Sequence, residues 1–442
     1  MEVHFTGIHS GGKSVGMVGS ENQMTKKIYA DNAIPGEEAL VTVLRRQRGF
    51  RQGVVHQILT PSPHRVTPFC PHAGICGGCH WQHIAYPAQL YWKRQILADA
   101  LAKYGIHTSA IPEVIPSPLL HHYRNKSEYA FSSEPAPVFG FHPKEERRTV
   151  FACEHCFLQA PQVHQIAKNV CRVALELGIP FYRYADRTGV LQSLQVRTTT
   201  LGDTFCILGL TKTESCFLDR LQQEIPMVNG WFYYVSGPNT FYPDYIYAGG
   251  ARYLEETIDG IRFAFSPESF FQPNPLQTAA LYRQVKTYSG LDRGKTVYDL
   301  YTGIGSIACY LANDAGQVIG IEGNPVAIRD ANKNAALNGL SNTQFIAGDI
   351  LETFTPAFID HHPKADLIIL DPPRSGTLTE IKKALLYAAP QKIIYVSCNP
   401  VSLAWDLKQL CAGGYRVTAI QPFDMFPHTH HVETVCLLET VS

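Results

Sequence analysis

Residues 297–308 read VYDLYTGIGSIA, and no other stretch constrains the architecture as strongly. An apolar run leads into a turn that contains Gly303 and Gly305, and a helical pattern follows. Glycine lets a ligand approach the backbone closely, and the start of a helix offers amide groups without partners. The stretch therefore predicts a strand, a ligand-binding turn and a helix, an order typical of a nucleoside site.

The sequence around this stretch alternates apolar strand-like runs with helical runs such as NPVAIRDANKNAALNGL. Apolar strands separated by helical crossovers indicate an α/β fold, a doubly wound sheet with a mainly parallel core. Ligands of such sheets bind beyond the carboxyl ends of the strands. The predicted strands are KTVYDLYTG, QVIGIEG, TQFIAGD, ADLIILDPP, KIIYVSCNP, YRVTAIQPF and HVETVCLLE.

Unusual residues concentrate at these strand ends. Glu322 ends the second run, where its carboxylate could accept hydrogen bonds from ribose hydroxyls. The pattern Gly-x-Gly-x-x-Ala with a later acid fits a dinucleotide nearly as well as S-adenosylmethionine. A helix-capping turn with a surface glutamate is the structural alternative.

Three further residues indicate chemistry at the same edge. Asp371 precedes two prolines, which cannot continue an interior strand, so the chain leaves the sheet there. Cys398 ends the fifth run; it is either a thiol exposed to a cleft or a buried structural cysteine. Glu433 could act as a general base facing Cys398, or lie solvated at a strand edge. A metal site in the nearby run of histidines is disfavoured, because neighbours on an extended segment point apart.

The preceding part of the chain predicts two other folding patterns. Residues 1–60 mix short β-branched runs with polar turns, which predicts a small antiparallel β-barrel or sandwich. After a proline-rich linker, residues 87–105 have helical spacing and end at Gly105. Residues 123–262 read as an α+β section. We therefore expect three segments, 1–60, 61–262 and 263–442, with the helical stretch near 87–122 packing on the last.

Composition limits the function. The 442 residues are 45% hydrophobic and 17% charged, which excludes a mainly disordered chain or a charged coiled coil. The 38 basic residues balance 38 acidic ones, so a polyanionic partner would need a local basic surface. One candidate surface, either for phosphate contact with base stacking or merely a solvated hairpin loop, comprises Phe50 with Arg45, Arg46, Arg48 and Arg51.

The chain has no apolar run long enough to span a membrane and does not start with a secretory signal, so we expect a cytoplasmic protein. Its 12 cysteines are too sparse for a disulfide scaffold. Six that are scattered among apolar neighbours are expected to be small buried hydrophobes: Cys171, Cys206, Cys216, Cys309, Cys411 and Cys436.

The chain resembles the RNA uracil-5-methyltransferase family, bacterial enzymes that form 5-methyluridine from S-adenosylmethionine. The resemblance is carried by SFFQPNPLQTAALY, VYDLYTGIGSIA, GIEGNPVAIRDANKNA, DLIILDPPRSG, YVSCNP and DMFPHTHHVETVCLLE. It implies a Rossmann-like methyltransferase domain, and residues 1–60 resemble the TRAM barrel of RNA-modifying proteins. The chain differs from its relatives at Thr302, where many have Cys, and at Ser306, where transfer-RNA relatives have Asn.

The segment CPHAGICGGCHWQH resembles the ribosomal-RNA branch, in which such cysteines hold a four-iron four-sulfur cluster. The implied ligands are Cys70, Cys76, Cys79 and Cys156; Cys153 is the alternative fourth ligand. Without the resemblance, four thiolates would equally suit zinc. A structural role is expected, since thiolates would fill all four positions.

The resemblance also implies the roles of the other residues. Cys398 is the nucleophile that adds to carbon 6 of uracil, and Glu433 removes the proton of carbon 5. Arg124, Asn125 and Lys126 are implied RNA or domain-interface contacts. The cofactor contacts are Gln272, Tyr301, Gly303, Gly305, Glu322, Asp349 and Asp371.

The sequence thus predicts a monomeric methyltransferase acting on one uridine of large-subunit 23S ribosomal RNA, without a membrane partner. The alternatives are a transfer-RNA uracil-5-methyltransferase and an RNA-binding protein of the same fold without turnover. Arg374 stands where adenine methyltransferases have a stacking aromatic residue, and DPPRSG lacks the second cysteine of cytosine-5 enzymes. A dinucleotide-dependent oxidoreductase is opposed by DPPRSG and SCNP.

Overall fold

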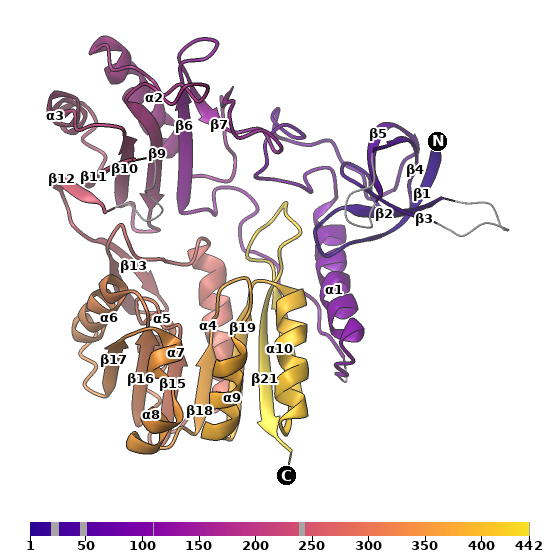
Figure 1. Ribbon diagram of the computed structural model, residues 1–442, viewed down its shortest axis with the longest axis vertical. Coiled ribbons are helices and arrows are strands. Elements are labelled where there is room, and N and C mark those ends of the chain that lie inside the picture. Colours follow the sequence, from indigo (N-terminus) through magenta and orange to yellow (C-terminus); the bar gives the residue numbers. More distant parts are fainter. Residues whose placement is uncertain (19–25, 45–50, 109, 238–243, 442) are drawn as a thin grey trace. The chain divides into compact units, whose positions relative to one another are not determined.

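The computed structural model describes residues 1–18, 26–44, 51–108, 110–237 and 244–441 (Figure 1). Contacts divide the chain into two compact units. The three predicted segments do not coincide with these units, and their boundaries stay a prediction. The first unit contains residues 1–117, 372–378 and 395–442, and the second contains residues 118–371 and 379–394.

The N-terminal strands form a closed barrel in the order β1-β2-β3-β5-β4 (Figure 1). β1 pairs with both β2 and β4, which closes the sheet and leaves no edge strand. The structure thus decides for a barrel over a sandwich, although β3 and β5 pair in parallel. Its buried core includes Val3, Phe5, Ile28 and Val41. The strands are β1 (Glu2–Ile8), β2 (Ser14–Val18), β3 (Lys26–Ala30), β4 (Glu38–Val43) and β5 (Arg51–Thr60).

The predicted helix after the linker is α1 (Tyr86–Lys103). Ile96, Leu97 and Leu101 on its apolar face are buried. α1 packs against α10 (Pro400–Ala412), and the Tyr104 and Trp405 rings meet edge to face with centroids 5.6 Å apart.

A seven-stranded sheet in the order β12-β11-β10-β9-β6-β7-β8 forms the middle of the chain. Helices α2 and α3 contribute to the core on one face of it (Figure 1). The predicted α+β character is therefore present. Its elements are β6 (Lys126–Ser132), β7 (Val138–Phe141), β8 (Phe151–Ala152), α2 (Pro161–Glu176), β9 (Leu191–Thr198), β10 (Thr204–Leu210), α3 (Ser215–Glu224), β11 (Gly230–Val235) and β12 (Ile246–Gly250). A two-stranded sheet of β13 (Leu254–Ile258) and β14 (Ile261–Phe265) follows, and then α4 (Pro275–Ser289).

The C-terminal sheet has the order β17-β16-β15-β18-β19-β21-β20. β15 is parallel to β16 and β18, and the C-terminal strands β20 and β21 pair antiparallel. All seven predicted strands and the doubly wound pattern are confirmed. The elements are β15 (Thr296–Leu300), α5 (Ser306–Ala312), β16 (Gln317–Glu322), α6 (Pro325–Leu337), β17 (Thr343–Ala347), α7 (Ile350–Thr353), α8 (Pro356–His361), β18 (Leu367–Leu370), α9 (Thr379–Ala388), β19 (Lys392–Ser397), β20 (Tyr415–Phe423) and β21 (Glu433–Thr440).

The scattered cysteines follow the prediction only in part. Cys206, Cys309 and Cys436 are buried, whereas Cys216 is exposed and Cys171 and Cys411 are partly exposed. Cys216 lies in the first turn of α3, on the side of the helix opposite the buried Phe217, Leu218 and Leu221. Among the helices of the described ranges, none is both long and apolar enough to span a membrane.

Candidate active site

The turn after β15 has an unusual backbone. Tyr301, Gly303 and Gly305 have φ angles of 64°, 56° and 72°, in the left-handed region. A Cβ atom on Gly305 would lie 2.8 Å from the Phe345 ring, so only glycine fits there. Tyr301 has a side chain and still adopts this left-handed conformation, which strains its backbone. Residues with such strained backbones are found most often at functional sites.

Glu322, the last residue of β16, fastens this turn. One carboxylate oxygen accepts a hydrogen bond from the Gly303 amide at 3.2 Å, and the other accepts one from the Asn324 amide at 2.8 Å. Glu322 is thus hydrogen-bonded to the turn and is partly exposed. Each carboxylate oxygen has a second lone pair, so Glu322 can still accept from a ligand hydroxyl.

Asp299 lies inside β15 and was not predicted as a site residue. It is 1% exposed, and one of its carboxylate oxygens accepts hydrogen bonds from the Thr302 hydroxyl (2.6 Å) and the Ala308 amide (3.2 Å). The other oxygen is buried without a hydrogen-bond partner. Burial raises the pKa of Asp299 to about 7. An acid in the middle of an apolar strand was the signal that the sequence offered.

Asp371 follows β18 at the same edge, because β15 and β18 are parallel. Burial, and then the neighbouring Asp299 carboxylate, raise the pKa of Asp371 to about 7. The Gln272 side-chain amide donates to Asp371 at 3.4 Å. Asn125 in turn donates its side-chain amide to the Gln272 carbonyl at 2.9 Å. Of the two alternatives for Asn125, this contact supports the one in which it joins the middle sheet to the catalytic segment.

The second unit therefore collects six of the seven predicted cofactor residues near the carboxyl ends of β15, β16 and β18, or in contact there: Gln272, Tyr301, Gly303, Gly305, Glu322 and Asp371. Asp349 is exposed and caps α7, accepting from the Leu351 amide at 2.8 Å. A glycine turn with several acids suits a nucleoside that carries positive charge.

Cys398 directly follows β19 and is partly exposed, so the alternative of a fully buried structural cysteine is wrong. The next residue, Asn399, caps α10 by accepting from the Val401 amide at 3.1 Å. Its side-chain amide also donates to the Arg374 carbonyl at 2.8 Å. The position of Cys398 is thereby fixed from both the strand and the helix.

Glu433 is the first residue of β21 and is only 4% exposed, so it is not a solvated edge residue. It pairs with Phe423 of β20, which lies at the outer side of β21. Arg374 donates a hydrogen bond to the His431 ring at 3.2 Å, two residues before Glu433. Arg374 therefore connects the segment of Cys398 with the segment of Glu433.

Known proteins resemble the chain over nearly its whole length. A family model described as tRNA (Uracil-5-)-methyltransferase matches residues 252–441. An uncharacterised RNA methyltransferase of Porphyromonas gingivalis is 37% identical, over 93% of this chain and 95% of that protein. An uncharacterised RNA methyltransferase of Thermotoga maritima is 32% identical, over 93% and 94%. The chain belongs to the RNA uracil-5-methyltransferase family.

A solved structure of a related methyltransferase has the same fold as this chain. The tRNA (uracil-54, C5)-methyltransferase of Pyrococcus abyssi, in complex with S-adenosyl-L-homocysteine, has a TM-score of 0.80 and 26% identity, over 99% of this chain and 100% of that one. The fold is thus that of an S-adenosylmethionine-dependent methyltransferase with a closed five-stranded barrel at its N-terminus.

The implied iron–sulfur ligands of this chain are divided between its two units. Within the described part of the chain, no group of three or more His, Cys, Asp or Glu side chains is arranged to hold a metal ion. Cys70, Cys76 and Cys79 are partly exposed in one unit, and Cys153 and Cys156 belong to the other. The loop that carries the first three cysteines contains backbone hydrogen bonds from the Ala73 amide to the Cys70 carbonyl and from the Cys76 amide to the His72 carbonyl.

Most of the predicted basic cluster falls outside the part of the chain that the structure describes. Arg45, Arg46, Arg48 and Phe50 lie outside the described residues. Arg51 begins β5 and is partly exposed.

Proposed function

We propose that this enzyme transfers a methyl group from S-adenosylmethionine to carbon 5 of a specific uridine in RNA, through a covalent adduct of Cys398 at carbon 6. The observation that carries the proposal is the connection of the partly exposed Cys398, through Asn399, Arg374 and His431, to the buried Glu433. A thiol and a carboxylate are the nucleophile and the base that this chemistry needs.

The reaction needs the thiol because carbon 5 of uracil is a weak nucleophile. The Cys398 thiolate forms a bond to carbon 6, and the electron pair of the 5,6 double bond moves into an enolate. S-adenosylmethionine supplies an electrophilic methyl group, which carbon 5 accepts as the methyl–sulfur bond breaks. Glu433 then removes the proton from carbon 5, and the sulfur–carbon 6 bond breaks to regenerate the thiolate.

We propose that the second unit binds the cofactor through Gln272, Tyr301, Gly303, Gly305, Glu322, Asp349 and Asp371. Support comes from the glycine turn that leaves room for a ligand and from Glu322, whose carboxylate keeps free lone pairs. Asp299 and Asp371 place two carboxyl groups at the same strand ends, and a cofactor with a sulfonium and an ammonium group would favour their charged forms.

For the RNA, we propose one uridine of 23S ribosomal RNA and a cytoplasmic, monomeric enzyme. The support is the resemblance of residues 70–83 to the ribosomal-RNA branch. Transfer RNA is the second candidate, because the solved relative of 26% identity is a tRNA (uracil-54, C5)-methyltransferase. A target base in folded RNA would have to leave its stack to reach Cys398.

The test is to incubate the enzyme with methyl-labelled cofactor and either ribosomal or transfer RNA from a deletion strain, and to map 5-methyluridine by mass spectrometry. We expect Cys398→Ala to abolish both product and covalent adduct, and Glu433→Gln to accumulate adduct. The control is Cys216→Ala, which removes an exposed thiol of α3. If 5-methyluridine forms in neither RNA, the proposal is contradicted and an RNA-binding protein without turnover is favoured. Full activity of Cys398→Ala would contradict the proposed covalent mechanism.

We propose a four-iron four-sulfur cluster on the basis of the resemblance of residues 70–83 to the ribosomal-RNA branch; its implied ligands, Cys70, Cys76, Cys79 and Cys156, are partly exposed. No step of the reaction depends on it. Iron analysis and visible absorption of anaerobically purified enzyme test the hypothesis. Protein that is active but contains neither iron nor the broad absorption would rule it out.

A further inference from the structure

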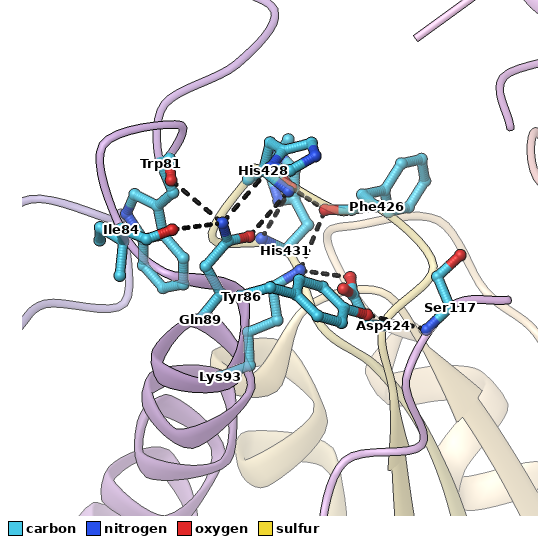
Figure 2. A network of polar contacts seen from close by, with 11 residues as sticks. Trp81, Ile84, Tyr86, Gln89, Lys93, Ser117, Asp424, Phe426, His428 and His431 are labelled. Carbon is cyan, nitrogen blue, oxygen red and sulfur yellow. Dashed lines mark hydrogen bonds and ion pairs between the residues drawn. The ribbon is translucent and has the colours of Figure 1, made fainter. Parts of the chain in front are cut away.

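The loop between β20 and β21, residues 424–432, leads directly into Glu433. We call it the base loop. Helix α1 lies beside it, and two polar residues on the buried side of that helix, Gln89 and Lys93, contact the loop (Figure 2). Gln89 and Lys93 are four positions apart in the sequence, so they lie on the same face of α1.

Lys93 contacts the beginning of the base loop. It forms an ion pair with Asp424, and both side chains are fully buried. Its ammonium group also donates to the Phe426 carbonyl at 3.0 Å. A buried ion pair is weak evidence for a gain in stability, because desolvation opposes the attraction. Its geometry does, however, fix where the loop leaves β20.

Gln89 contacts the middle of the base loop and is 1% exposed. Its carbonyl oxygen accepts from the His428 amide at 2.9 Å, and its amide nitrogen lies 3.3 Å from the His428 ring. The same amide donates to the carbonyls of Trp81 (3.1 Å) and Ile84 (2.8 Å). Figure 2 shows these contacts converging on one side chain.

The segment before α1 completes the attachment. The amides of His80 and Trp81 both donate to the His428 carbonyl at 3.0 Å. The Phe69 ring packs edge-on against the His428 ring, with centroids 4.9 Å apart. His428 has a φ of 66°, a conformation that non-glycine residues rarely adopt and that surrounding contacts must hold. From this point the loop continues to His431, which accepts from Arg374, and then to Glu433.

We propose that Gln89 and Lys93 are positioning residues, which hold the base loop so that Glu433 can reach the proton of carbon 5. The inference rests on the proposed function. It assigns a catalytic consequence to a helix that contributes no reacting group. Loosening the loop should slow the step that Glu433 performs and leave the preceding attack of Cys398 unaffected, so the covalent enzyme–RNA adduct should accumulate.

The experiment compares Gln89→Met with Gln95→Met on the same helix. Methionine keeps the volume of Gln89 but removes its hydrogen bonds. Gln95 is a matched control, because its amide contacts only Asp99 on the helix surface. We expect Gln89→Met to lower kcat about tenfold with KM for RNA unchanged within about twofold, and to raise the fraction of adduct on denaturing gels. Gln95→Met should behave as the unsubstituted enzyme.

Equal kcat and equal adduct in the two variants, or a loss of activity without adduct, would overturn the inference. If Gln89→Met does not fold by circular dichroism, Lys93→Met combined with Asp424→Leu removes both buried charges together and is judged by the same adduct measurement. The proposed function fails separately, when the unsubstituted enzyme makes no 5-methyluridine.

Discussion

Two carboxyl groups near the glycine turn, the buried Asp299 and the partly exposed Asp371, have unusual pKa values. Burial raises the pKa of each to about 7, so each holds a proton in the free enzyme at a pH where an exposed aspartate has lost it. A cationic cofactor near them would favour the charged forms. At neutral pH the free protein is therefore less stable than it would be if these two carboxyl groups had ordinary pKa values.

The pH dependence of Asp299→Asn tests this view. Between pH 4 and 7 the native state keeps a proton that the unfolded state has lost, so Asp299 makes the protein less stable as pH rises through this range. Asparagine retains the acceptor for Thr302 and Ala308 without the charge. We expect the gain in the free energy of unfolding from Asp299→Asn to be about 2 kcal/mol larger at pH 8 than at pH 5. Urea unfolding at both values measures it.

Asp259→Asn is the control for that measurement. The hydrogen bond from Arg283 lowers the pKa of Asp259, so its carboxylate is ionised in both the native and unfolded states at pH 5 and at pH 8. Its replacement should have the same effect on stability at the two pH values. An equally flat response of Asp299→Asn would show that Asp299 is already ionised.

Helix α6 contributes to the fold through polar side chains as well as apolar ones. Asp330, Asn334 and Asn338 follow one another at four-residue intervals, and they accept hydrogen bonds from the amides of Ser266 (2.9 Å), Ala264 (2.7 Å) and Arg262 (2.9 Å). These amides belong to every second residue of β14 and to the residue after it, and they face the edge of β14 that does not pair with β13. The helix thus satisfies backbone donors that a free strand edge would expose.

Asn334→Ala should be costly for this reason. Asn334 is 0% exposed, accepts from the Ala264 amide and donates to the Ile304 carbonyl at 3.0 Å. Alanine leaves both groups buried without partners, and we expect a loss of about 2 kcal/mol in the free energy of unfolding. Asn332→Ala on the exposed side of α6 is the matched control and should cost less than about 0.5 kcal/mol. Equal losses in urea unfolding would contradict the role assigned to Asn334.

The strands of the C-terminal sheet could be predicted because each is an apolar run closed by Gly, Pro or Asp, a signal that does not depend on distant residues. The hydrogen bonds from the β14 amides to Asp330, Asn334 and Asn338 could not be predicted, because Asp and Asn on a helix ordinarily face solvent. Barrel and sandwich could not be separated either. Closure depends on the pairing of β1 with β4, which the alternation of apolar residues does not encode.

For the molecule as a whole, the sequence predicted where the candidate site residues lie, but it did not predict the long-range contacts around them. The strand-end rule placed Glu322, Asp371 and Cys398 correctly. Lys93 and Asp424 were missed, because they are 331 positions apart and only the folded chain brings them together. The thiol ligand set was implied by the resemblance to the ribosomal-RNA branch, and it stays a prediction.

RNA binding should also reflect the whole charge distribution. The 38 basic and 38 acidic residues cancel, so affinity for RNA must come from local basic surfaces. We expect Arg45→Ala with Arg46→Ala to weaken RNA binding and to lower the slope of log affinity against log salt by about 1 for each lost phosphate contact, and thus by about 2 for the pair. Filter binding between low and physiological salt measures the slope.

The matched control is Arg147→Ala with Arg148→Ala, which removes an adjacent pair of exposed arginines from the middle segment. It changes the net charge of the molecule by the same amount, so a slope that falls equally in both variants would mean that long-range charge attracts the RNA. A fall confined to Arg45 and Arg46 requires direct phosphate contact, because released counterions are counted per contact. If neither slope changes, the segment of Arg45 and Arg46 is the solvated hairpin loop of the alternative interpretation, and the barrel does not contribute these phosphate contacts.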